Sequence, residues 1–390
     1  MRGRSGRDRV SSPGAGSTSG AGSTSGAGST SSAGSTSGAG STSGRWGLVL
    51  GGGGVLGGAW TVGALSALEE VHGLDPRDAD LIIGTSAGSV TAALLGVGVR
   101  VDDLRRLQFD EPVENGPLAG VTWDPDSGTG GSLPPPPRFT GPSSVGLVAH
   151  NIGRLRRLPP TAVLAALLPE GRGSLAAVGH LVRQAAGAGW AEHPGVRVVA
   201  MNLDAGRRVP FGAPGAPPAA LADAVMASCA IPGWYAPVTI GGVRYVDGGA
   251  CSSTNVDLAA GQALDRVFVL APMVSFATDA PRHWRAQAER RWRERVTRRC
   301  LREVTKVYTD GAEVTVVGPG PEDLEVLGSN LMALDRRHLV LRTSLRTSSR
   351  ALRDPEVLDA LPPAMRTHEQ DVTGPGAPGP IGGGALGEVG

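Results

Sequence analysis

Residues 80–88 read DLIIGTSAG, a short apolar run that leads directly into a serine between two glycines. Residues 80–83 predict a buried strand, and residues 89–95 can begin a helix. A G-x-S-x-G sequence between a strand and a helix is typical of a nucleophile elbow, where glycines flank the serine because side chains would clash in so tight a turn. Ser86 is therefore the candidate nucleophile, and an ordinary tight turn between strand and helix is the alternative.

A glycine loop comes before this turn. Residues 46–50 predict a first strand, and four glycines at positions 51–54 follow it at once. Residues 55–71 then predict a helix that ends near Gly73. A strand, a helix and a second strand in this order predict a βαβ unit with parallel strands and a right-handed crossover. The glycine loop and the serine then lie at the carboxyl ends of adjacent strands and face one crevice.

The glycine loop has two interpretations. Gly52, Gly54 and Gly57 match the dinucleotide fingerprint G-x-G-x-x-G, but no carboxylate for a ribose stands at the end of the second strand. Alternatively, the amides of consecutive glycines converge at a helix N-terminus and stabilise the negative charge of an acyl-transfer transition state. We favour this oxyanion hole, because the second strand runs into Ser86.

A nucleophilic serine needs a base, and the candidates are three histidines and one aspartate. His283 and His338 stand in arginine-rich helical contexts, and His368 stands near the C-terminal end, so we interpret all three as surface residues. Asp247 ends a hairpin predicted over residues 238–246, and two glycines follow it. A carboxylate acts as a base only where it contacts the hydroxyl in a poorly solvated site, because its ordinary pKa is low. An Asp-Gly β-turn is the alternative.

The order and spacing of these motifs resemble those of the patatin-like phospholipase family. The resemblance rests on residues 51–57, 84–88 and 247–249, together with the ASCAIP run at residues 227–232, and it covers roughly residues 45–275. It implies an α/β fold of three layers, α/β/α, with a mostly parallel central sheet.

The resemblance also implies roles for individual residues. Ser86 would be the nucleophile, Asp247 would accept its proton in a Ser–Asp dyad, and the backbone amides of Gly52, Gly53 and Gly54 would form the oxyanion hole. We therefore expect a lipid acyl hydrolase of the esterase or phospholipase A type that acts on a lipid or ester substrate and uses no cofactor and no metal ion.

Two other functions stay open. An acyltransferase would use the same site to pass the acyl group to an acceptor other than water. A lipid-binding or regulatory protein would keep the fold with a degraded site. Leu56 favours the second alternative, because it stands where the family usually carries Arg or Lys.

The composition divides the chain into four parts. Residues 1–44 repeat Gly, Ala, Ser and Thr and predict a disordered tail, because they hold too little apolar surface to order themselves. Residues 45–275 predict the catalytic core, residues 276–362 a helical and strand extension packed on the core, and residues 363–390 a flexible tail. The Pro- and Gly-rich stretch at 110–145 predicts a surface excursion that could form a lid.

The charge and the cysteines limit the classes of partner. The net charge of +1 gives no electrostatic case for nucleic acid. Cys229, Cys251 and Cys300 have neither metal-ligand spacing nor a disulfide pattern, and fit a reducing compartment. The sequence shows no secretory signal and no membrane-spanning run, so we expect a cytoplasmic protein. The oligomeric state is left open.

The stretch at 281–306 is strongly basic. It holds nine arginines and one lysine against three glutamates, with apolar residues recurring every four positions. One interpretation is an interfacial helix that contacts an anionic membrane surface. The interpretation we favour is an ordinary amphipathic helix whose apolar stripe packs on the sheet and whose basic face is solvated.

Overall fold

The computed structural model describes residues 44–121, 123, 133, 135, 136, 141–150, 158–277, 281 and 283–354, without the side chains of 148–150. The predicted tail at 363–390, the tail at 1–44 apart from Gly44, and much of the excursion predicted at 110–145 lie outside these residues.

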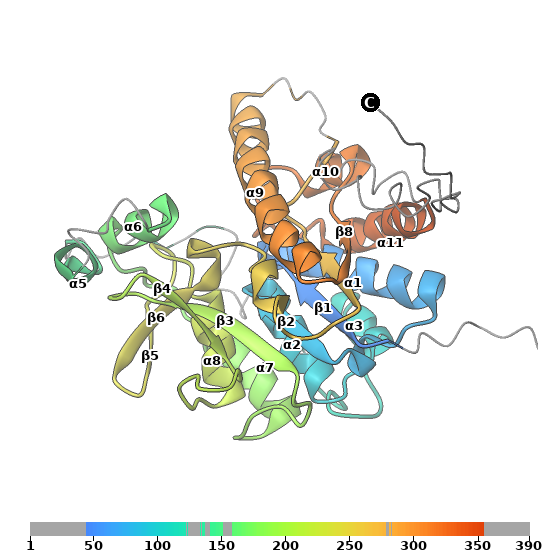
Figure 1. Cartoon of the computed structure of the whole chain (residues 1–390), viewed down its shortest axis with the longest axis horizontal. Coiled ribbons are helices and arrows are strands. Elements are labelled where there is room, and N and C mark those ends of the chain that lie inside the picture. Colours follow the sequence, from blue (N-terminus) through green and yellow to red (C-terminus); the bar gives the residue numbers. More distant parts are fainter. Residues whose placement is uncertain are drawn as a thin grey trace, which may run out of the picture. The chain divides into compact units, whose positions relative to one another are not determined.

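An eight-stranded sheet runs through the described part of the chain (Figure 1). Its strands are β1 (Trp46–Leu50), β2 (Leu81–Thr85), β3 (Val196–Asn202), β4 (Arg207–Phe211), β5 (Val238–Ile240), β6 (Val243–Asp247), β7 (Arg266–Leu270) and β8 (Glu313–Val317). The order is β5-β6-β3-β2-β1-β7-β8, with β4 also paired to β3. Strands β3, β2, β1, β7 and β8 are parallel, whereas β4, β5 and β6 pair in antiparallel fashion. The expected mostly parallel sheet is confirmed.

Helices cover both faces of the sheet because successive strand side chains point to opposite faces. Leu48 and Leu50 of β1 belong to a buried cluster with one set of helices. These helices are α1 (Gly54–His72), α2 (Ala87–Gly96), α3 (Val101–Gln108), α7 (Ala176–Ala186), α8 (Leu221–Cys229) and α11 (Arg337–Arg353). Val49, between the two leucines, belongs to a second cluster with α9 (Trp284–Thr309) and the short helix η4 (Val256–Ala259). The three layers that the sequence predicts are therefore present.

The second face also carries α5 (Val145–His150) and α6 (Pro160–Leu167). Their buried residues pack against Met201 of β3 and Val246 of β6. Both helices lie near the β6 end of the sheet, whereas α9 packs beside β7 and β8. The remaining short elements are η1 (Pro76–Asp78), η3 (Gly248–Ala250) and α10 (Pro321–Leu327).

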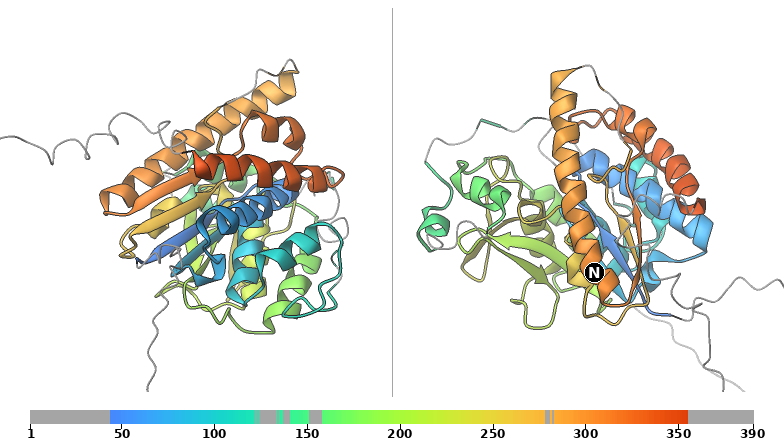
Figure 2. Two further views of the ribbon diagram at one scale, coloured as in Figure 1. Left: turned by 90° about the vertical axis from the view of Figure 1, so that its right-hand side faces the viewer. Right: turned by 45° about the horizontal axis from the view of Figure 1, so that its top comes forward.

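Residues beyond 275 contribute a strand and a major helix to this core. Strand β8 pairs with β7 along its whole length. Helix α11 lies alongside α1 (Figure 2), and the Ser344 hydroxyl donates to the carbonyl of Trp60 at 2.6 Å. The structure agrees with the prediction at four places: the first strand, the glycine turn after α1, the 238–246 hairpin and the strand at 313–317. Helix α3 was not predicted, although Val101, Leu104 and Leu107 show its helical spacing.

No helix among the described residues is both long enough and apolar enough to cross a membrane.

Candidate active site

Ser86 stands at the sharp turn between β2 and α2. Its backbone has φ 53° and ψ −126°, a conformation that L-residues rarely adopt. The flanking glycines permit the turn: a Cβ on Gly88 would lie 2.2 Å from the carbonyl oxygen of Leu50, and one on Gly84 would lie 2.5 Å from that of Gly88. Any larger residue at either position would displace backbone, so this turn has the geometry of a nucleophile elbow.

Two serine hydroxyls hold the turn in place. The amide of Ser86 donates to the hydroxyl of Ser228 at 2.9 Å, and that hydroxyl donates to the carbonyl of Val199 at 2.6 Å. The hydroxyl of Ser89 donates to the Ser86 carbonyl at 2.6 Å. All three serines are buried. Ser228 was not identified as a site residue from the sequence, although the ASCAIP run that contains it was.

The sheet brings Asp247 to Ser86 from the far end of the chain. Strand β2 pairs with the first half of β3 and ends at Thr85, opposite Val199. Strand β6 runs the other way along the second half of β3 and ends with Asp247, opposite Ala200. The two strand ends therefore meet at consecutive residues of β3. This junction places the residue after Thr85 beside Asp247.

The junction of the two strands sets the Asp247 carboxylate beside the Ser86 hydroxyl, which favours the ionised form of that carboxylate. Both side chains are nearly inaccessible, with 8% of Ser86 and 5% of Asp247 exposed. Burial raises the pKa of Asp247 to about 6, although the Ser86 hydroxyl and the hydrogen bond from the Gly249 amide, at 2.7 Å, act in the opposite direction. A carboxylate with this pKa is a better proton acceptor than an exposed one and is still ionised at neutral pH.

The glycine loop lies against Ser86 on its other side. A Cβ on Gly52 would stand 3.1 Å from the Cβ of Ser86, so only a glycine allows this approach. The Gly52 amide donates to the carbonyl of Ser253 at 2.8 Å. The amides of Gly53 and Gly54 have no acceptor within the described part of the chain. The Gly52 amide is therefore engaged in holding the loop, and the predicted oxyanion hole of Gly52, Gly53 and Gly54 stays a prediction.

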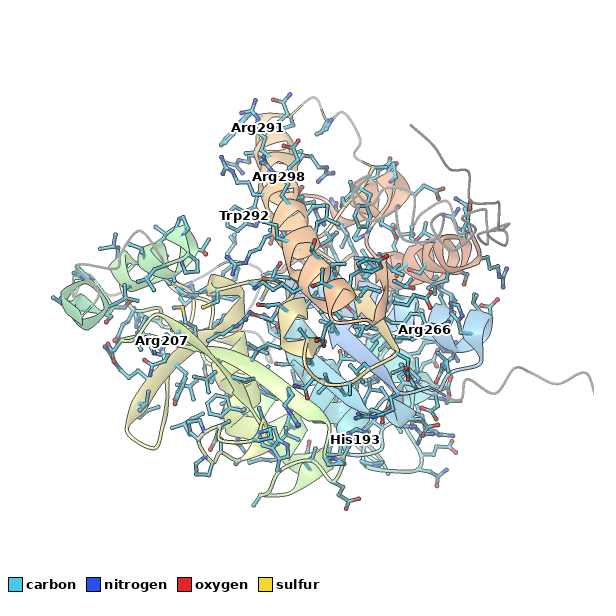
Figure 3. All side chains as sticks on the ribbon, viewed as in Figure 1. His193, Arg207, Arg266, Arg291, Trp292 and Arg298 are labelled. Atoms are coloured by element: carbon cyan, nitrogen blue, oxygen red, sulfur yellow. The ribbon has the colours of Figure 1, made fainter. Side chains whose placement is uncertain are left out.

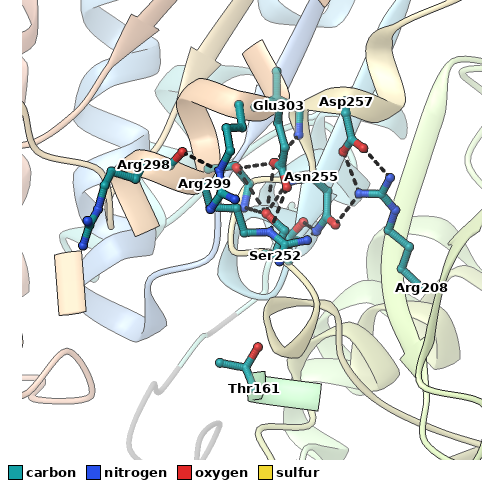
Figure 4. A network of polar contacts seen from close by, with 12 residues as sticks. Thr161, Arg208, Ser252, Asn255, Asp257, Arg298, Arg299 and Glu303 are labelled. Carbon is teal, nitrogen blue, oxygen red and sulfur yellow. Dashed lines mark hydrogen bonds and ion pairs between the residues drawn. The ribbon is translucent and has the colours of Figure 1, made fainter. Parts of the chain in front are cut away.

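A buried glutamate fastens the segment that supports the glycine loop (Figure 4). One carboxylate oxygen of Glu303, on α9, accepts from the hydroxyls of Ser252 and Thr254 at 3.0 and 2.9 Å and from the amide of Val256 at 3.2 Å. Within the same segment, Asn255 donates to the Thr85 hydroxyl at 3.0 Å. Helix α9 thus fixes the backbone on which both Gly52 and the residue before Ser86 rest.

Two pockets open from Ser86, one on each side of the sheet. The first is apolar and is lined by α1, α2, α3 and α7, with Val62, Val90, Leu104 and Val178 among its walls. The second is a broader groove between α6 and α9 that borders Asp247 and the glycine loop. An ester bond placed at Ser86 would have one substituent in each pocket.

Comparison with known proteins identifies the family. A sequence model of patatin-like phospholipase matches residues 48–260, which is more than half of the chain. The chain belongs to the patatin-like phospholipase family. The family is one of lipid hydrolases, and the matched segment includes the glycine loop, Ser86 and Asp247 but ends before α9. Among solved structures, the crystal structure of VipD from Legionella pneumophila matches with a TM-score of 0.39 and 16% sequence identity, over 79% of this chain and 67% of that chain. No curated protein matches.

At position 56 the sequence departs from the patatin-like pattern, because it has Leu56 where the family usually carries Arg or Lys. Its side chain is fully buried in the main core, and its amide donates to the carbonyl of Leu331 at 2.9 Å. It lines neither pocket at Ser86. The substitution therefore removes a charge from the loop without obstructing the site.

The histidines stand apart from this patatin-like site. His283 accepts a hydrogen bond from the Arg285 amide at the start of α9, and His338 lies 3.5 Å from a carboxylate oxygen of Asp110. Neither lines a pocket at Ser86. His368 lies outside the described residues. Among the described residues, Asp247 is the acid that lies beside Ser86 and lines the groove there.

Proposed function

We propose that the protein is a lipid acyl hydrolase that cleaves carboxylic esters through Ser86 and Asp247. The observation that carries the proposal is the junction of β2 and β6, which sets the Ser86 hydroxyl beside the buried Asp247 carboxylate, whose pKa is raised to about 6. A serine held at φ 53° presents its oxygen at the mouth of two pockets, where an ester carbonyl can approach it.

The reaction needs no group beyond the chain and water. The Ser86 oxygen attacks the ester carbonyl carbon while its proton passes to Asp247. The oxyanion of the tetrahedral intermediate accepts from the amides of Gly53 and Gly54, and one such donor is worth about 3 kcal/mol in the transition state. The intermediate expels the alcohol, which takes the proton from Asp247. Water activated by Asp247 then releases the fatty acid and restores Ser86.

The apolar pocket supports an acyl chain as the part of the substrate that the protein buries. Val62 of α1, Val90 of α2, Leu104 of α3 and Val178 of α7 face the same space. Burying a methylene group against such walls contributes about 0.8 kcal/mol. A chain of several carbons therefore gains far more here than a short acetyl group does.

The test is covalent labelling with a fluorophosphonate, which reacts only with an activated serine. We expect the wild-type protein and Ser174→Ala, an exposed serine, to be labelled, and Ser86→Ala not to be. Ester hydrolysis should fall about 10⁴-fold in Ser86→Ala and in Asp247→Asn. Labelling that persists in Ser86→Ala, or hydrolysis that survives both changes, would contradict the proposal. Labelling without hydrolysis, but with acyl transfer to an added alcohol, would indicate a transferase.

We also propose that the face around the groove contacts an anionic membrane surface. Leu164 and Leu167 of α6 are 55% and 52% exposed, and Trp284 and Trp292 of α9 are 66% and 41% exposed. Leu164 and Trp292 line the groove itself. Apolar side chains beside a basic helix are typical of surfaces that rest at a lipid interface.

A further inference from the structure

The groove on the α9 side of Ser86 is lined by three arginines. Arg295, Arg299 and Arg302 form its outer wall, and Ser86 and Asp247 lie at its inner end. Among the described residues that line the groove, Asp247 is the only acid. The outer wall of the groove therefore carries a net positive charge, because Glu303 pairs with Arg299 alone.

The three arginines lie on one face of α9, because they are four and three positions apart. The side chain of Arg295 makes no hydrogen bond or ion pair with a described residue. The Nε of Arg302 donates to the backbone carbonyl of Arg298 at 3.2 Å, and the Nε of Arg299 donates to Glu303 at 3.1 Å. In the described part of the chain, the terminal guanidinium nitrogens of all three arginines are left without an acceptor.

Three other cations of α9 are paired with acids. Arg290 and Arg293 both pair with Glu289, and Lys306 pairs with Asp257 at 3.1 Å. Like charges at neighbouring positions on one helix face repel each other, so a row in which only Arg299 has an acidic partner is unfavourable unless an anion binds to it. Guanidinium groups offer planar pairs of N–H donors that match phosphate oxygens, which makes phosphate a fitting anion.

We propose that Arg295, Arg299 and Arg302 bind the phosphate of an acyl ester whose carbonyl lies at Ser86. The acyl chain would enter the apolar pocket on one side of the sheet, and the phosphate-bearing headgroup would lie in the groove on the other. The phosphate site rests on the proposed function, because the ester bond must lie at Ser86 for the acyl chain to enter one pocket and the headgroup the other. Helix α9 lies beyond residues 48–260, so the family segment does not supply this site.

A pair of matched esters tests the site. A 1-acylglycerol and a 1-acylglycerol 3-phosphate with the same acyl chain are compared in the same neutral micelles. Arg295→Gln combined with Arg302→Gln should lower kcat/KM for the phosphate ester about tenfold or more, through KM, and change the neutral ester less than about twofold. Arg298→Gln removes the same kind of charge from the same turns of α9 outside the groove, and should change neither ester more than about twofold. An equal loss on both esters, or no loss on the phosphate ester, overturns the proposal.

A binding measurement separates this site from the catalytic proposal. A 1-alkylglycerol 3-phosphate ether cannot be hydrolysed, and we expect calorimetry to detect its binding to Ser86→Ala. Adding the Arg295→Gln and Arg302→Gln changes should weaken that binding about tenfold or more. Inorganic phosphate alone should bind about 100-fold more weakly, because it lacks the apolar chain. Equal affinity for both would indicate a free-phosphate site and overturn the headgroup assignment. Arginine-dependent ether binding in a protein that hydrolyses neither ester would support the phosphate site while the catalytic proposal fails.

Discussion

At Ser86 the backbone conformation and the partner of the hydroxyl come from different parts of the chain. The elbow depends on the glycines of residues 84–88, because a Cβ on Gly84 or Gly88 would lie only 2.5 or 2.2 Å from a backbone oxygen. The carboxylate comes from Asp247 at the end of β6, and burial raises its pKa, which suits the base that we propose.

The pKa of Asp247 predicts the pH dependence of hydrolysis. A base must be ionised, so kcat/KM for a neutral ester should rise with pH up to about 6 and stay level above it. The measurement is a pH profile between 4.5 and 8. Glu69 is a control, since burial also raises its pKa to about 7 but it lies on α1 outside the site. The acidic limb should remain in Glu69→Gln. A profile that is level from 4.5 to 8 would contradict Asp247 as the base.

The close approach at Gly88 predicts a large loss of stability on substitution. Gly88→Ala would place a Cβ 2.2 Å from the carbonyl oxygen of Leu50, which is backbone and must shift. We expect the free energy of unfolding in urea to fall by about 3 kcal/mol or more. Gly58→Ala is the matched control inside α1, where the nearest atom would be 3.7 Å away. It should raise stability by about 0.5–1 kcal/mol. Similar effects of the two changes would refute this explanation.

At the scale of elements, α9 connects the second face of the sheet to the active site. Its inner side carries the buried Glu303, and its outer side carries Trp292 and Arg298, which Figure 3 marks along the helix. The helix is amphipathic, but the stripe predicted to pack on the sheet does not do so throughout: Trp284 and Trp292 are exposed, and the core is reached by Cys300, Val304 and Val307. The sequence did not show that Glu303 of this helix also positions the backbone beside Ser86.

Glu303 is expected to act as a positioning residue. Glu303→Gln cannot accept all the hydrogen bonds that reach the carboxylate, so we expect a loss of about 1–3 kcal/mol in the free energy of unfolding. The loop that carries Ser253 and Asn255 would loosen, and kcat should fall while KM changes little. Glu294→Gln, on the exposed side of α9, is the control and should change stability by less than about 0.5 kcal/mol. If Glu303→Gln is destabilised but its kcat is unchanged, Glu303 contributes to stability and does not position the site.

The rim of the groove predicts preferential binding to anionic vesicles. The wild-type protein should cosediment with vesicles that contain anionic lipid more than with neutral ones, and salt should weaken that binding. Leu164→Ser combined with Trp292→Ser removes apolar contact from both sides of the groove and should reduce vesicle binding. Leu339→Ser, which changes an exposed leucine of α11 away from the groove, is the control. Equal binding by all three proteins would argue against this face.

At the scale of the whole molecule, the segment matched to the family is not a complete core. Strand β8 extends the sheet beyond β7, and α11 buries one side of α1. A Cβ on Gly63 of α1 would lie 2.7 Å from the carbonyl of Leu341, which shows how closely the two helices approach.

A chain that ends after residue 275 should therefore fail to fold cooperatively. Its α1 would expose the surface that α11 covers, and β7 would become an open edge. Urea unfolding followed by circular dichroism provides the measurement. Removal of residues 1–43 is the control and should leave the transition unchanged, as the sequence predicts for a polar repeat. A cooperative transition in the shortened chain would show that the extension is dispensable for folding.

The sequence by itself determined the features that depend on local geometry. The elbow at residues 84–88, the glycine loop before α1, the hairpin that ends in Asp247 and the alternation of strands and helices all follow from short-range patterns of glycine and apolar residues. Such patterns act over a few residues, so they can be identified in the sequence without knowledge of the rest of the chain.

The tertiary structure determined which residues from distant parts of the chain are in contact. Only the junction of β2 and β6 along β3 places Asp247 against Ser86, and only packing shows that the Gly52 amide is engaged by Ser253. The contact of Ser228 with the Ser86 amide and the arginines in the outer groove likewise join distant parts of the chain. These contacts depend on strand order and burial, which one-dimensional spacing does not encode.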